Sequence, residues 1–139
     1  MMILWREDLN IGVAAVDTQH QELVRILNDF LVACTQQKGK GKIIETLDFL
    51  VSYTITHFTD EEAIMVKNSY PNYDVHKLEH ERFVQDIITI KRQVETQGVS
   101  VLTTIKINRT LVDWLINHIQ KDDQILGAYI KGLTGSSKQ

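Results

Sequence analysis

Residues 73–94 read YDVHKLEHERFVQDIITIKRQV, and this stretch decides the fold. Its apolar and histidine positions recur in alternating steps of three and four, at Tyr73, His76, His80, Phe83, Ile87, Ile90 and Val94. Steps of this size place side chains on one face of an α-helix, as in the seam between packed helices. The sequence therefore predicts a helix here whose buried face carries two histidines.

Three other segments have the same period. In the segment after Asp17, the inward positions are His20, Leu23, Leu27, Phe30, Leu31 and Cys34. In the segment before Pro71, they are Ile43, Leu47, Leu50, Thr54, His57, Glu61 and Met65. In the segment after Gly98, they are Val101, Ile105, Asn108, Val112, Leu115 and His118. Four long helices joined by short loops must lie antiparallel to their neighbours. The sequence thus predicts an all-α, up-down-up-down four-helix bundle, with Asp17 as the N-cap of its first helix.

The ends of the chain differ from this pattern. We expect residues 1–139 to form a single domain, in which residues 1–16 are an extended N-terminal arm, 17–133 the helical bundle and 134–139 a frayed tail. Residues of the arm such as Trp5, Val13 and Val16 are expected to pack over the bundle. A short C-terminal helix is expected to carry Ile125, Leu126, Tyr129, Ile130 and Leu133.

Composition excludes several classes of function. The formal net charge is −3 and the lysines and arginines are scattered, which argues against nucleic acid as a partner. No apolar run is long enough to cross a bilayer, and the first ten residues do not resemble a signal peptide, so we expect no membrane association and a cytoplasmic protein. The only cysteine, Cys34, lies on an apolar face and is expected to be buried without a functional role.

The five histidines are the main functional signal. Each falls on the predicted inward face of its helix, and one histidine in such a position is more often a hydrogen-bonded core residue than a metal ligand. Five imidazoles and a carboxylate in one small core would, however, leave many buried polar groups without partners. His57 and Glu61 are four residues apart, as are His76 and His80, so each pair leaves one helix face. The pattern favours a metal site.

The motifs HxxxE, HxxxH and HxxxxD with one upstream histidine resemble those of the hemerythrin family, in particular its single-domain bacterial members, over nearly the whole chain. The resemblance implies two iron ions bridged by an oxo or hydroxo group and by two carboxylates. It implies His76, His80 and His118 as ligands of one iron, and His20 and His57 as ligands of the other. Glu61 and Asp123 would be the bridging carboxylates.

The resemblance also implies a function, which is reversible dioxygen binding for storage, transport or delivery of oxygen. Two octahedral irons with this ligand set keep one position open, on the iron that has two histidines. The family's apolar pocket positions correspond to Phe58, Trp114, Leu115 and Ile119, for which plain core packing is an equally good interpretation. None of these side chains can transfer a proton, so we expect binding rather than enzymatic turnover. Nitric oxide and small anions such as azide are further candidate ligands.

Two alternatives keep a metal and change the function. Residues 76–80, HKLEH, match the HxxEH pattern of zinc peptidases, in which Glu79 would activate a water molecule. That interpretation leaves three histidines without a role and puts Glu79 off the buried face. The second alternative is a di-iron enzyme that reduces peroxide or nitric oxide, or a sensing module for oxygen or nitric oxide that acts through an unidentified signalling or oxygen-consuming partner.

The second bridging carboxylate is ambiguous in the sequence. Asp122 lies four residues after His118 and so shares its face in a regular helix, whereas Asp123 is rotated from it by about 140°. The family spacing selects Asp123. Both can hold only if the helix is interrupted between Ile119 and Asp123 by a wide turn or a break. We expect Asp123 to be the bridge and Asp122 a solvated or helix-capping carboxylate.

Overall fold

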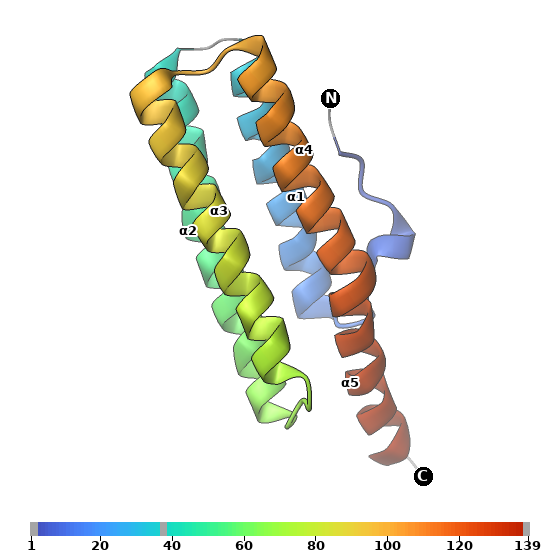
Figure 1. Cartoon of the computed structure of the whole chain (residues 1–139). Helices are drawn as coiled ribbons and strands as arrows, with labels where there is room; N and C mark the ends of the chain where they lie inside the picture. The colour runs from blue at the N-terminus through green and yellow to red at the C-terminus, as the bar shows by residue number, and fades with distance from the viewer. Residues whose placement is uncertain (1–2, 37–38, 138–139) are drawn as a thin grey trace.

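The computed structural model describes residues 3–36 and 39–137, with side chains up to residue 133. Four long helices dominate it: α1 (Ala14–Thr35), α2 (Lys40–Lys67), α3 (Tyr73–Gln97) and α4 (Val101–His118). They run alternately up and down and pack in a ring, each against the next and α4 against α1 (Figure 1). The described residues contain no strand. The predicted all-α four-helix bundle is confirmed.

The first helix begins earlier than predicted. Its N-cap is Val13, and Asp17 lies one turn inside the helix, so the prediction of Asp17 as N-cap is wrong. The Asp17 carboxylate instead accepts hydrogen bonds from the backbone N–H groups of Ile11 and Gly12, at 2.7 and 3.1 Å. An N-cap side chain bonds forward into its own helix. Asp17 bonds backward and ties the preceding arm to the first turn.

The N-terminal arm is therefore shorter and more structured than the predicted residues 1–16. It contains a 3₁₀-helix, η1 (Glu7–Leu9), and its side chains Leu9 and Ile11 are completely buried. Trp5 packs against the main core as expected, and Val16 is buried inside α1. The Asn28 side chain of α1 pairs with both backbone groups of Ile3, at 2.8 Å each. Residues 1 and 2 lie outside the described part.

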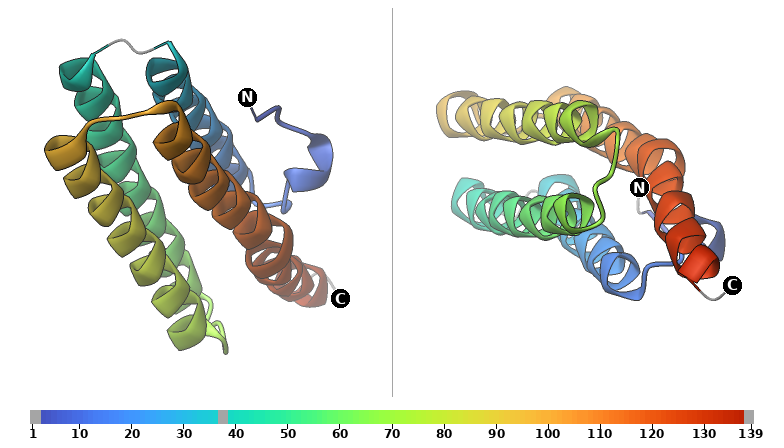
Figure 2. Two further views of the ribbon diagram at one scale, coloured as in Figure 1. Left: turned by 45° about the horizontal axis from the view of Figure 1, so that its top comes forward. Right: turned by 90° about the horizontal axis from the view of Figure 1, so that it is seen from below.

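The fourth helix does not break before the C-terminal one. A turn of π-helix, η2 (Ile119–Asp123), joins α4 directly to α5 (Gln124–Ser137), and the three elements form one continuous, bent rod that extends beyond the bundle (Figure 2). Residues 134–137, the first part of the expected frayed tail, continue α5; residues 138 and 139 lie outside the described part. Figure 2 also shows the arm crossing near this rod.

A close contact fixes the arm against α5. A Cβ atom added at Gly127 would lie 2.2 Å from the backbone oxygen of Ile11, so only glycine fits there. The Gln124 side chain donates hydrogen bonds to the backbone oxygens of Asp8 and Asn10, at 3.1 and 3.0 Å. The arm thus braces the junction between η2 and α5.

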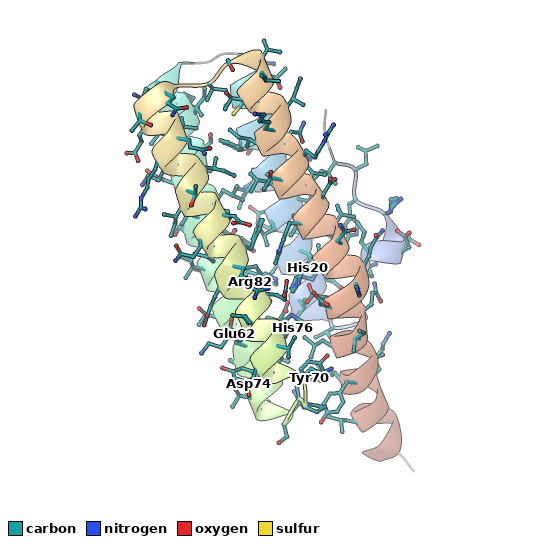
Figure 3. All side chains as sticks on the ribbon, viewed as in Figure 1. His20, Glu62, Tyr70, Asp74, His76 and Arg82 are labelled. Carbon is teal, nitrogen blue, oxygen red and sulfur yellow. The ribbon has the colours of Figure 1, made fainter. Side chains whose placement is uncertain are left out.

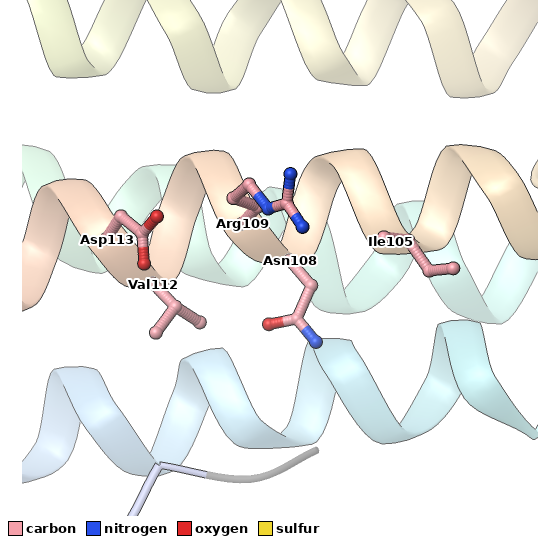
Figure 4. A pocket seen from close by; sticks show the side chains of 5 residues that line it. All are labelled: Ile105, Asn108, Arg109, Val112 and Asp113. Atoms are coloured by element: carbon pink, nitrogen blue, oxygen red, sulfur yellow. The ribbon is translucent and has the colours of Figure 1, made fainter.

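The buried faces of the first three helices agree with the predicted ones, apart from Tyr73, which is only partly buried. The prediction fails in the first half of α4, where Val101 and Ile105 are 68% and 51% exposed. The buried positions of α4 are Ile107, Asn108, Leu111, Leu115 and His118. Ile105 and Val112 instead line a surface pocket of about 160 Å³ together with Asn108, Arg109 and Asp113 (Figure 4).

Apolar residues lie on both faces of α4, so periodicity alone admits two registers there. The register is decided by contact with the neighbouring helices.

Among the described residues, no helix combines the length and the hydrophobicity needed to span a bilayer.

Candidate metal centre

Seven buried side chains converge between the helices in the half of the bundle nearest α5. They come from α1 (His20), α2 (His57 and Glu61), α3 (His76 and His80), α4 (His118) and η2 (Asp123), and none is more than 4% exposed. Figure 3 labels two of them, His20 of α1 and His76 of α3. The structure therefore brings together every residue for which the sequence predicted metal ligation.

The candidate ligand atoms form two groups. Three histidines, His76, His80 and His118, gather with Glu61 and Asp123, and the group of His20 and His57 gathers with Glu61; within each group the ligand atoms lie within 4.8 Å of one another. We call these the three-histidine group and the two-histidine group. The division is the one that the family resemblance implied.

Each carboxylate presents one oxygen to each group. Glu61 Oε1 lies 2.7 Å from His76 Nε2 and 3.2 Å from His80 Nε2, while Glu61 Oε2 lies 3.2 Å from His57 Nε2. Asp123 Oδ1 lies 3.0 Å from His76 Nε2, and Asp123 Oδ2 lies 3.1 Å from His20 Nε2. This arrangement suits carboxylates that bridge two cations.

The π-helical turn explains how Asp123 reaches the site. In a regular α-helix a residue five positions after His118 would point away from it. Hydrogen bonding from i to i+5 widens the turn by one residue, so Asp123 returns to the face of His118, 3.3 Å from its Nε2. Such turns occur frequently at functional sites.

Asp122 also faces His118, because its carboxylate accepts a hydrogen bond from His118 Nδ1 at 3.0 Å. Asp122 was expected to be a solvated or helix-capping carboxylate. It is 34% exposed, and in addition it bonds to the outer side of a candidate ligand. Two more side chains bond in the same way, Glu62 to His80 Nδ1 at 2.9 Å and Gln19 to His57 Nδ1 at 2.8 Å.

Sequence reasoning missed these three partners. A signal for Asp122 was present, since it lies four residues after His118. Glu62 and Gln19 bond to histidines 18 and 38 residues away, so only the packing of α2 against its neighbours brings the partners together.

The electrostatics of the buried side chains favour a cation at this centre. Burial lowers the pKa of His118, but the charge of Asp123, 3.3 Å away, and the hydrogen bond to Asp122 outweigh it and raise this pKa to about 10. In His20 and His76 burial is likewise outweighed, by close contact with the charged carboxylates of Asp123 and Glu61, and their pKa values rise to about 9. These three histidines therefore hold a proton, and with it a positive charge, next to the two buried carboxylates.

The pKa values of the two carboxylates and of His57 are shifted as well. Burial raises the pKa of Glu61, yet close contact with four imidazoles, those of His20, His57, His76 and His80, brings it well below its usual value. Burial also raises the pKa of Asp123, and the His118 charge is the main effect that brings it below normal. Desolvation lowers the pKa of His57.

Unsatisfied atoms show that the residues fit a metal. Both carboxylate oxygens of Glu61 and of Asp123, both ring nitrogens of His20 and the Nε2 atom of His76 are buried without a hydrogen-bond partner among the described residues. His80 Nε2 and His118 Nε2 also lie only 3.1 Å apart. Because Glu62 and Asp122 occupy their Nδ1 atoms, both Nε2 atoms face the centre. The proton of His118 lies between them in the metal-free fold, in the place that a bound cation would take.

Two of the four predicted pocket residues, Phe58 and Trp114, contact candidate ligands of this centre. Phe58 stacks on His80 with ring centroids 3.8 Å apart, and Trp114 stacks on His118 at 4.5 Å. Phe58 is farther from His57, at 5.6 Å, so the two aromatic rings contact the three-histidine group more closely. Leu115 and Ile119 are buried in the core.

Glu79, the candidate base of the peptidase alternative, lies apart from the centre. Its carboxylate is 3.6 Å from Arg82, and its side chain is 35% exposed. The imidazoles of His76 and His80 instead contact Glu61.

A four-helix bundle that buries five imidazoles and two shared carboxylates defines a protein with a metal centre of two ions. The family model described as the hemerythrin HHE cation binding domain matches residues 11–130. The chain therefore belongs to the hemerythrin family, and this membership implies a di-iron centre.

Individual relatives agree. A bacteriohemerythrin of Stenotrophomonas maltophilia is 33% identical over 94% of this chain and 82% of its own length. A bacteriohemerythrin of Pseudomonas paraeruginosa is 34% identical over 87% of this chain and 76% of its own length. The crystal structure of a wild-type hemerythrin superimposes with a TM-score of 0.80 at 27% identity and covers 92% of this chain and 97% of that one.

Proposed function

We propose that the chain binds dioxygen reversibly at a non-haem di-iron centre and acts in oxygen storage, transport or delivery. The three-histidine group would hold one iron, the two-histidine group the other, and Glu61 and Asp123 would bridge them. One observation carries the proposal: the two oxygens of each carboxylate face different histidine groups, at distances of 2.7 to 3.6 Å from the imidazole nitrogens.

When the two irons are bound, they supply the redox chemistry by which dioxygen is taken up and released. The protein's part is to hold neutral imidazoles and two carboxylates in a dry interior. Packing of Phe58, Leu115 and Ile119 keeps water from the ligands, since each is at most 4% exposed. These side chains carry no titratable group, so they neither give nor take a proton, which favours binding over turnover.

The location and use of the protein belong to the same proposal. A carrier of this kind would work in the cytoplasm without catalysing a reaction. Dioxygen is its main ligand, and nitric oxide or azide would compete for the same centre.

An absorption spectrum recorded through reduction, oxygenation and removal of oxygen tests the proposal, with metal content measured on the same sample. We expect two irons per chain and a visible charge-transfer band that forms with oxygen and disappears without it. One tightly held zinc ion with no oxygen-dependent band would contradict the proposal and favour a peptidase. Steady consumption of peroxide or nitric oxide would show an enzyme instead.

A further inference from the structure

The outer nitrogens of the histidines have partners of two kinds. In the three-histidine group, His80 Nδ1 bonds to the Glu62 carboxylate and His118 Nδ1 to the Asp122 carboxylate. In the two-histidine group, His57 Nδ1 bonds to the neutral amide of Gln19. His20 Nδ1 is buried and has no partner among the described residues. Anionic partners therefore stand behind one group only in the described part of the chain.

Hydrogen-bond chemistry fixes the direction of each contact. A carboxylate only accepts, so His80 and His118 donate through Nδ1–H and turn the Nε2 lone pair toward the centre. The Gln19 amide is oriented by Asp60, whose carboxylate accepts from Gln19 Nε2 at 2.8 Å. Its carbonyl oxygen must then face His57, which also donates through Nδ1. The imidazoles with a partner thus share one tautomer and differ in the charge of that partner.

The charge of the partner changes the strength of the ligand. A carboxylate that accepts the Nδ1 proton makes the imidazole more basic and a better metal donor at Nε2, and it also fixes the plane of the ring. A hydrogen bond to an ion is roughly twice as strong as one between neutral groups. Glu62 and Asp122 are only 20% and 34% exposed, so solvent screens their charges in part.

We propose that Glu62 and Asp122 are positioning residues that rank the two metal positions, so that the three-histidine group fills first and releases last, while the two-histidine group exchanges its metal more readily. This inference rests on the proposed function, because it requires that two ions bind. It adds that the carboxylates behind His80 and His118 contribute to the order of assembly, beyond the extra histidine of that group.

Anaerobic titration of the metal-free protein with ferrous iron, followed by calorimetry, tests the ranking. We expect two steps in the unaltered protein. Glu62→Gln and Asp122→Asn, which keep an acceptor oxygen but remove the charge, should weaken the first step about 10- to 100-fold and leave the second nearly unchanged. Glu81→Gln is the matched control, because Glu81 lines the same surface groove as Glu62 but is not among the partners of the candidate ligand histidines in the described part of the chain.

A charge swap provides the opposite change. Combining Gln19→Glu with Asp60→Asn moves the carboxylate next to His57 and keeps the net charge, and the amide introduced at position 60 could still donate to the new side chain at position 19. The swap should strengthen the second step by a similar factor. Thermal unfolding of each metal-free variant checks that the bundle is intact, and a metal-content assay at saturating iron should still find two ions.

The outcomes separate the two proposals. If two ions bind but the variants weaken both steps equally, or the swap leaves the second step unchanged, the ranking is wrong and the di-iron function stands. If the unaltered protein takes up no iron, the proposed function fails and the ranking fails with it.

Discussion

Asp122 and Asp123 are neighbours in the chain with opposite surroundings. Asp123 is completely buried, with both oxygens facing imidazoles, whereas Asp122 is partly exposed and bonds to the outer nitrogen of His118. Replacing a buried bridging oxygen with an amide nitrogen places N–H donors where a cation should bind. Replacing Asp122 leaves the atoms around the cation unchanged.

We therefore expect Asp123→Asn to reduce iron content to one ion per chain or fewer, and Asp122→Asn to keep two ions when iron is saturating. Iron analysis after removal of unbound metal measures the difference. Asp113→Asn, at an exposed position of α4, is the control for charge alone. Full iron content in Asp123→Asn together with loss in Asp122→Asn would show that Asp122 is the bridge.

Leu115 concerns protection of the centre rather than its assembly. It lies three residues before His118 and is 2% exposed. Leu115→Ala should speed oxidation of the oxygenated protein while iron content stays at two, because a smaller side chain lets water approach. The cavity should also lower the free energy of unfolding by about 2–5 kcal/mol. An autoxidation rate equal to that of the unaltered protein would remove Leu115 from the oxygen pocket.

At the scale of elements, the ligands could be predicted from the sequence more fully than their supports. His57 with Glu61 and His76 with His80 lie one turn apart in regular helices, so periodicity was sufficient to place them on one face. The π-helical turn was predicted as one of two forms, a wide turn or a break between Ile119 and Asp123, from the conflict between the position of Asp123 and helical spacing. Its form depends on the local backbone, and the prediction of a separate C-terminal helix missed that the rod is continuous.

The arm and the first half of α4 were predicted less well for a different reason. The contacts of Leu9 and Ile11 join residues that are far apart in the chain, and no local pattern encodes them. In α4, Ile105 and Ile107 are equally apolar, so hydropathy could not tell the exposed one from the buried one. In the second half of α4, the position of His118 indicated which face is buried.

Gly127 tests the contact between the arm and α5. Gly127→Ala should lower the free energy of unfolding by about 1–3 kcal/mol, because the added Cβ would collide with the Ile11 backbone oxygen. The matched control is Gly132→Ala in the same helix, where nothing lies within 4 Å of the new atom. That change should raise stability by about 0.5–1 kcal/mol through helix propensity. Denaturant unfolding of the metal-free proteins measures both, and equal effects would mean that the arm is not packed there.

At the scale of the whole molecule, protons and iron compete for one charged interior. His20, His76 and His118 have pKa values raised to about 9, 9 and 10 in the metal-free fold. A raised pKa contributes stability that is complete below the unfolded value near 6.5 and is lost as pH rises through the folded value. The free energy of unfolding of the metal-free protein should therefore fall from about pH 7 to pH 10.

Iron requires neutral imidazoles, so loading near neutral pH should release about three protons per chain, one from each of these histidines. Calorimetry in buffers with different ionisation enthalpies counts them. Thermal unfolding of the iron-loaded protein should lack the alkaline decline until the metal is lost. Loading without proton release would contradict the raised pKa values.

The stacking of Trp114 on His118 has a practical consequence. The protein contains two tryptophans, of which Trp114 touches a candidate ligand ring and also stacks on Phe83 at 4.0 Å, while Trp5 lies on the arm. The fluorescence of an indole in contact with an imidazole changes when that imidazole exchanges a proton for a metal ion, and iron is a strong quencher of indole emission. The chain thus carries its own fluorophore at the three-histidine group, and Phe replacement of Trp5 would leave that signal without background.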